Sequence, residues 1–214
     1  ATVNAGSGNV TLNSAGAIAD DGSTGTVVTG GVLTADAAGA ITIDSTVASA
    51  DISTSAAGAV DLDETDGITL TDLDTTDGSI TVDAGGLITA TDVVAGGSAG
   101  DSVTLSTTTG GAVATLVTGA DAVSITADAG DVTVGALTAT AGTLGVTATT
   151  GSINDAADDN TADFTAGGLI TLTAQDEIGV LGSGSDTDLE FAAGSSVNVS
   201  TTGTGAIDLD GLGA

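Results

Sequence analysis

A short apolar pattern recurs along this chain at intervals of about twenty residues. Each unit has an apolar residue, one intervening residue and a second apolar residue, and a glycine usually precedes the first by two positions. Most intervals between units are 18 to 23 residues, and we interpret the longer ones, of 31 and 26 residues, as containing loop insertions. Alternation with period two is typical of a β-strand with one buried face. The first apolar positions are residues 10, 41, 60, 80, 103, 123, 144, 170, 189 and 207.

The period is long enough for each unit to form one closed coil. Twenty residues of extended chain, at about 3.3 Å each, make a loop with a perimeter of roughly 65 Å. Equivalent positions hold equivalent residue types, which favours coils stacked on one another. The sequence therefore predicts an all-β fold, a parallel β-solenoid of about ten coils with a period of about twenty residues. Residues 1–214 would form a single repeat domain or a segment of a longer chain or fibre, and the alternative is an antiparallel β-sandwich.

Stacked coils lie about 4.8 Å apart, so equivalent residues should form columns along the axis. A column of glycines marks a turn where the backbone needs either positive φ or close approach of its neighbour. Its members are Gly8, Gly39, Gly58, Gly78, Gly142, Gly168 and Gly205. The residues after the second apolar positions form an outward column, in which three consecutive coils carry Asp. This column holds Asn13, Asp44, Asp63, Asp83, Ser106, Thr126, Thr147, Thr173, Ala192 and Asp210.

The Asp column creates a charge problem, because this chain has no Lys, Arg or His. Its 26 Asp and 3 Glu give a formal net charge of −29. Two carboxylates about 4.8 Å apart repel by roughly 1 kcal/mol in water and by more at a lower effective dielectric constant. Raised pKa values, salt or bound cations can relieve this repulsion. Calcium is the natural cation, because it takes about six to eight oxygen ligands.

Five aspartates are the candidate calcium ligands. Asp61 lies two residues before Asp63 on the same strand face. Asp101 follows a glycine-rich segment, 96–100, that is similar to the glycine–aspartate segments of calcium-binding repeats. The candidate set is Asp44, Asp63, Asp83, Asp61 and Asp101, and no cofactor other than calcium is expected.

The missing residue types exclude most catalytic chemistry. Nucleophilic triads need His or Lys as a base, and phosphoryl transfer normally uses Lys or Arg on the phosphates. The lack of positive charge also argues against binding to nucleic acid or anionic lipid. No apolar run reaches about 18 residues, so membrane insertion is not expected. The sequence therefore predicts a protein that is not an enzyme and has no catalytic residues.

Several units resemble the repeats of filamentous-haemagglutinin-like exoproteins. The units are GSITVDAGGLITATDVV (78–94), AGGLITLTAQDEIGV (166–180) and GAVDLDETDGITLTD (58–72). Members of that family are large bacterial surface adhesins whose stalks are parallel β-helices with coils of about this length. The resemblance implies an extracellular or cell-surface location and a role as a stalk.

We therefore expect an extracellular structural protein that forms a cell-surface filament, an adhesin stalk or a surface layer. Exposed strand edges at the ends of a solenoid recruit further strands. Head-to-tail stacking of copies of this chain would give a polymer that does not close. The alternative is a calcium-dependent adhesive module or an ice-binding module, because Thr-x-Thr pairs such as 171/173 resemble the threonine ranks of ice-binding β-solenoids. The sequence does not identify a cell-surface or glycan ligand.

Overall fold

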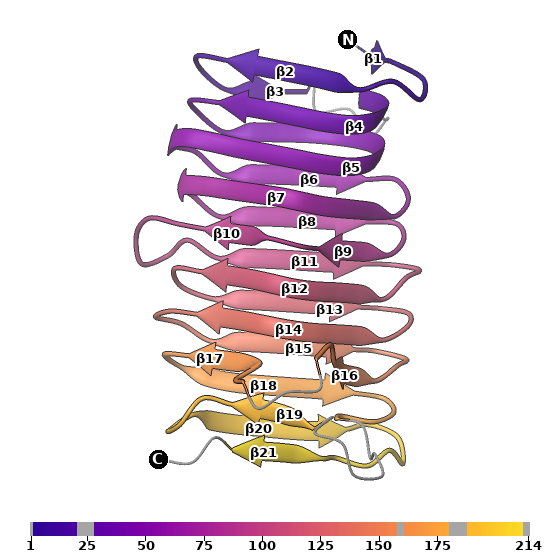
Figure 1. The fold of residues 1–214 in the computed structure, drawn as a ribbon, viewed down its shortest axis with the longest axis vertical. Coiled ribbons are helices and arrows are strands. Elements are labelled where there is room, and N and C mark those ends of the chain that lie inside the picture. Colours follow the sequence, from indigo (N-terminus) through magenta and orange to yellow (C-terminus); the bar gives the residue numbers. More distant parts are fainter. Residues whose placement is uncertain (1, 21–27, 158–160, 180–187, 212–214) are drawn as a thin grey trace.

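The chain winds into a column of stacked β-coils (Figure 1). The computed structural model describes residues 2–20, 28–157, 161–179 and 188–211, and it contains no helix in these ranges. The described residues form about nine turns with a period of about 21 residues. Every strand pairing among them is parallel. The predicted parallel β-solenoid is confirmed, and the antiparallel sandwich is wrong.

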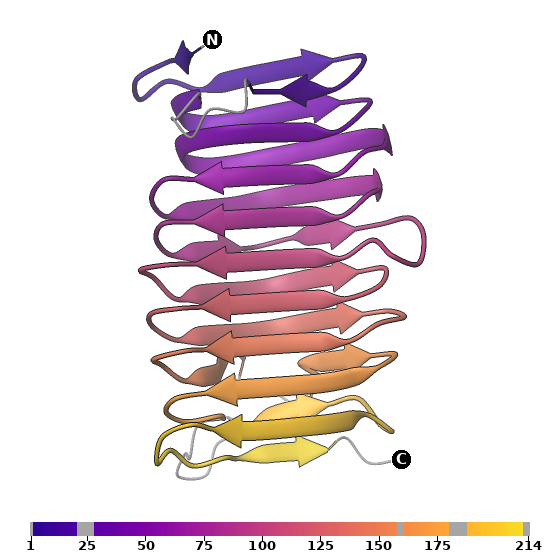
Figure 2. The ribbon, with the colours of Figure 1, turned by 180° about the vertical axis from the view of Figure 1, so that it is seen from behind.

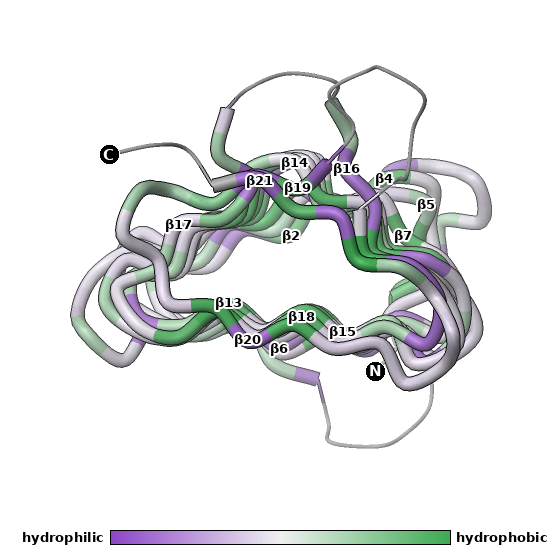
Figure 3. The backbone as a smooth tube through the Cα atoms, turned by 90° about the horizontal axis from the view of Figure 1, so that it is seen from below, coloured by the Kyte–Doolittle hydropathy of each residue, from purple (hydrophilic) through white to green (hydrophobic). Residues whose placement is uncertain are grey.

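Each coil has two sides, which face each other across a narrow interior (Figure 3). Face B, seen in front in Figure 2, is built mainly from strands of about five residues. Its strands are β3 (Ile18–Ala19), the start of β5 (Ile41–Ala57), β6 (Val60–Glu64), β8 (Ile80–Ala84), β11 (Val103–Thr107), β13 (Val123–Ala127), β15 (Leu144–Ala148), β18 (Leu169–Ala174) and β20 (Ser196–Thr201).

Face A carries the longer strands, and β5 crosses from one face to the other. Some coils have one continuous strand on this face, whereas others have two short ones. β1 (Val3–Asn4) pairs with the start of β4 (Val28–Ala37), in the column where face B ends, and β4 continues onto face A. The other strands of face A are β2 (Val10–Ser14), β7 (Ile68–Asp77), β9 (Ile88–Ala90), β10 (Val93–Ala95), β12 (Ala112–Gly119), β14 (Val132–Ala139), β16 (Ile153–Asp155), β17 (Phe164–Ala166), β19 (Leu189–Phe191) and β21 (Leu209–Gly211).

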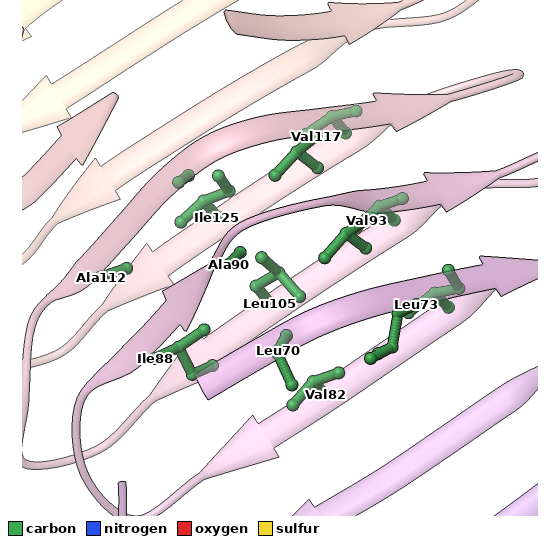
Figure 4. Packing of buried hydrophobic residues seen from close by; sticks show 14 of the residues in the cluster. Leu70, Leu73, Val82, Ile88, Ala90, Val93, Leu105, Ala112, Val117 and Ile125 are labelled. Carbon is green, nitrogen blue, oxygen red and sulfur yellow. The ribbon is translucent and has the colours of Figure 1, made fainter. Parts of the chain in front are cut away.

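The core is a set of apolar columns that run through the interior (Figure 4). On face B the inward residues alternate strictly, as in β13, where the first, third and fifth residues are buried. On face A two successive residues point outward in the middle of the strand. In β14 these are Gly135 and Ala136, between the buried Val134 and Leu137. This double outward step interrupts the alternation of the strand, and Val, Ile, Leu and Ala side chains fill most of the space between the faces.

The register corrects the predicted membership of the columns at both ends of the chain. First apolar positions 41, 60, 80, 103, 123, 144 and 170 do share one column of face B. This column begins at Ile18 and continues to Val197. Val10 and Leu189 lie instead on face A, where they pair with Leu33 and Leu209. Ile207 also lies on face A, in the column of Ile153 and Ile178. The predictions were wrong here because the same apolar alternation occurs on both faces. The 31-residue interval therefore includes a change of face.

Three glycines of the predicted column lie where the backbones of neighbouring coils approach closely. Gly39, Gly58 and Gly78 occupy the turn before face B in successive coils, and none of them has positive φ. A Cβ atom on Gly58 would lie 2.4 Å from the backbone nitrogen of Ala40. These positions therefore need glycine because the neighbouring backbone approaches closely, and not because of positive φ. Gly8 and Gly205 do not belong to it, because they precede segments on the other side of the coil.

Candidate functional site

Three aspartates stack on the outer surface of face B. Asp44 pairs with Asp63, and Asp63 pairs with Asp83, on the adjacent strands β5, β6 and β8. We call these three residues the acidic ladder, and its stacking confirms the sequence prediction. The ladder lines a shallow groove of about 330 Å³. Burial raises the pKa of Asp63 above its usual value, and the charges of Asp61 and Asp83 raise it further.

The other two predicted calcium ligands are placed differently. Asp61 lies on the same outward side of β6 as Asp63, two residues nearer the start of the strand. Asp101 lies at the opposite end of the face B strands, where its Oδ2 accepts a hydrogen bond of 2.9 Å from the Ser98 amide. Ser98 also donates from its hydroxyl to Asp77 Oδ1 at 2.8 Å, which lowers the pKa of Asp77. The structure thus brings four of the five candidates to one face and leaves Asp101 apart.

A buried glutamate lies directly beneath the acidic ladder. Glu64 is the last residue of β6 and points inward. Its Oε2 accepts hydrogen bonds from the Ser45 hydroxyl at 2.6 Å and from the Val47 amide at 3.1 Å. Burial raises the pKa of Glu64, although these hydrogen bonds oppose the effect. Sequence reasoning missed this residue, yet the fifth position of the aligned strands, with Ser45 and Ala84 as neighbours, identifies it as inward-facing.

Beyond the ladder, face B changes from acidic to uncharged. The column of Asp83 continues through Ser106, Thr126, Thr147, Thr173 and Ser200. The outward column beside it holds Thr104, Ser124, Gly145, Thr171 and Asn198. We call these ten residues the hydroxyl region. The prediction was wrong for three residues of the Asp column, all of which lie on face A. Asn13 stacks on Asp36, Asp210 stacks on Glu190, and Ala192 follows the face A strand β19. The hydroxyl region gives face B an uncharged surface next to its acidic one.

A second pair of acids is buried near the C-terminal end of the solenoid. Asp163 and Glu190 occupy adjacent coils, immediately before Phe164 and Phe191, whose rings stack with centroids 5.2 Å apart. The Glu190 amide donates to Asp163 Oδ2 at 2.9 Å, and the Asp163 amide donates to the Glu190 carbonyl at 3.0 Å. Burial raises the pKa of Asp163 to about 8. Sequence reasoning missed this pair. The two residues are neighbours in a face A column, and the repeat pattern did not show which residues share that column.

We compared the chain with known protein families, curated proteins and solved structures. No protein family, curated protein or solved structure matches this chain. In the part of the chain that the structure describes, no group of three or more acidic, His or Cys side chains has the arrangement of a metal site. The same residues include no helix that could cross a membrane. The functional argument therefore rests on the solenoid and its surfaces.

Proposed function

We propose that this chain is an extracellular structural protein that stacks head to tail into a cell-surface filament, an adhesin stalk or a surface layer. The observation that carries the proposal is that two core columns end in exposed apolar side chains at the C-terminal coil. Val197 is 45% exposed, whereas Ile170 beside it in the same column is buried. Ile207 is 43% exposed, whereas Ile178 in its column is buried. Another coil placed on this end would bury both side chains.

The first coil of a second copy has the features needed to cover this end. Among the described residues, each end strand pairs with a single neighbour: β20 on face B and β21 on face A at one end, and β3 on face B and β2 on face A at the other. The outer edges of β20 and β21 therefore present backbone donors and acceptors that can meet those of β3 and β2 in a second copy. Leu12 and Ile18 of the first coil are partly buried apolar residues that already pack against the core. Contact between two different ends is heterologous, so it repeats without closing and produces a filament.

The net charge sets the conditions for assembly. Copies that each carry a charge of −29 repel one another, and salt shortens the range of this repulsion. We expect the purified chain to form filaments as ionic strength rises, and electron microscopy with light scattering would detect them. Dispersed single particles at every salt, calcium and protein concentration would overturn the proposal.

A pair of variants separates stacking from general surface effects. Val197→Asp places a charge at the stacking end, so this variant should remain dispersed under conditions in which the wild type forms filaments. Leu169→Asp is the matched control, because Leu169 is similarly exposed, at 42%, but lies on the side of the solenoid. The control should assemble like the wild type. Circular dichroism of both variants would verify that the coils are intact.

The second candidate is a calcium-dependent module, which the stacking of Asp44, Asp63 and Asp83 favours. A cation bound only to the folded chain stabilises it by mass action. We expect a chelator to lower the melting temperature at low salt, and added Ca²⁺ to restore it at constant ionic strength. Asp63→Asn should remove most of this response. Asp128→Asn, at an exposed position immediately after the face B strand β13, should retain it. A melting temperature that changes with neither chelator nor added Ca²⁺ would rule out the calcium module.

The ice-binding alternative would use a different surface. It would place ordered water on the hydroxyl region, where no acidic side chain interrupts the columns. Thermal hysteresis of the dissolved protein would favour this alternative over the filament. Filaments without thermal hysteresis would favour the structural role.

A further inference from the structure

The buried pair Asp163 and Glu190 joins two coils at the C-terminal end. Asp163 is 5% exposed and Glu190 is 1% exposed. The amide of each residue donates a hydrogen bond to the other residue, and the carboxyl group of Glu190 raises the pKa of Asp163 further. These contacts link the segment that begins with Asp163 to β19, and β19 pairs in turn with β21 of the last described coil.

No positive charge is available to this pair. Asp155 of β16 adds further negative charge, and Asp210 of β21 stacks on Glu190. The other described strands around the pair, β14, β15 and β18, carry no ionisable residue. The chain has no Lys, Arg or His in its sequence. Two buried carboxylates in this position would repel at short range, so the packed arrangement requires that they retain a proton.

We propose that Asp163 and Glu190 form a proton-dependent latch that holds the C-terminal coils in register at neutral pH and releases them in alkaline solution. This inference deepens the proposed function, on which its link to assembly rests, because the same coils carry Val197 and Ile207 at the stacking end. Filament growth at this end would then depend on pH.

The direction of the pH effect follows from the protonation of Asp163. Its pKa in the folded chain, about 8, lies above the value of 3.8 for a free aspartate. The folded state therefore binds this proton more tightly than the unfolded state does. The stabilisation is complete below the unfolded pKa and is lost as pH rises through about 8.

Hydrogen exchange of the dispersed chain at low salt tests the latch without requiring filaments. Mass spectrometry would compare peptides from 188–211 with peptides from 103–139, at about pH 6 and about pH 9.5, after correction for intrinsic exchange rates. We expect protection of 188–211 to fall by about tenfold for each pH unit from about pH 6 to about pH 8, and to level off above 8, where both states have lost the proton. Protection of 103–139 should change much less, because its strands bury no acid.

Asp163→Asn supplies the decisive comparison. Asparagine can accept the hydrogen bond from the Glu190 amide but cannot ionise, so protection of 188–211 should become nearly independent of pH. Glu190→Gln should do the same if Asp163→Asn does not fold, and Asp128→Asn is the exposed control. Equal protection of 188–211 in the wild type at both pH values would overturn the latch and leave the filament proposal intact. A pH-dependent latch in a chain that never assembles would support the latch and overturn the filament.

Discussion

Replacing Gly78 with Val is expected to lower the free energy of unfolding by about 3 kcal/mol, the upper part of the usual range for overpacking. A Cβ atom at this position would lie 2.4 Å from the Gly58 carbonyl oxygen and 2.8 Å from the Ala59 nitrogen. Both are backbone atoms of the neighbouring coil, so no side chain can rotate out of the way. The coils are held together on both sides of this contact. The Gly58 amide donates to the Asp77 carbonyl at 2.8 Å, and the Val60 amide donates to the Ser79 carbonyl at 2.9 Å.

Gly145→Val is the matched control for this substitution. Gly145 also lies on face B, in β15, and a Cβ atom there would meet nothing within 4 Å. Valine suits an extended strand, so we expect no loss of stability and a gain of up to about 1 kcal/mol. Urea denaturation of the two variants would measure both effects. Equal losses in the two variants would show that close approach of the coils is not the reason for the glycine column.

Leu105→Ala is expected to cost about 2–5 kcal/mol, whereas Leu116→Ala should cost less than about 1 kcal/mol. Leu105 is 1% exposed and lies between Val82 and Ile125 of the adjacent coils (Figure 4). Removing its side chain leaves a cavity between two coils that the backbone ladder keeps at a fixed spacing. Leu116 is 38% exposed, so its truncation leaves no cavity in the core.

This second comparison also tests the double outward step of face A. After the inward Ala112 and Ala114, strict alternation would point Leu116 into the core. The structure instead has Thr115 and Leu116 both outward and returns to the core at Val117. Thermal or urea unfolding of the two alanine variants would distinguish these arrangements. A loss for Leu116→Ala as large as that for Leu105→Ala would contradict the outward step.

The acidic residues show how far the sequence could identify candidate sites. Asp44, Asp63 and Asp83 follow the repeat directly, so their stacking on adjacent strands could be predicted from spacing alone. Glu64 and Asp163 could not be recognised by residue type, because an acid in this chain is normally a surface or turn residue. Their burial depends on which side of a strand they occupy and on what covers that strand. The inward side of Glu64 follows from its alternation with Val60 and Leu62, but for Asp163 neither property is contained in the local pattern.

The sequence by itself determined the architecture, because a fixed period and a strict alternation leave few ways to bury the apolar residues other than stacked coils. Only the tertiary structure decided which residues share a column. Val10 and Ile41 carry the same local pattern but lie on opposite faces, and Leu116 leaves the core where alternation would place it inside. The reason is physical: apolar alternation specifies that one side of a strand is buried, whereas the face to which the strand belongs is fixed by the bends between strands and by hydrogen bonds to neighbouring coils.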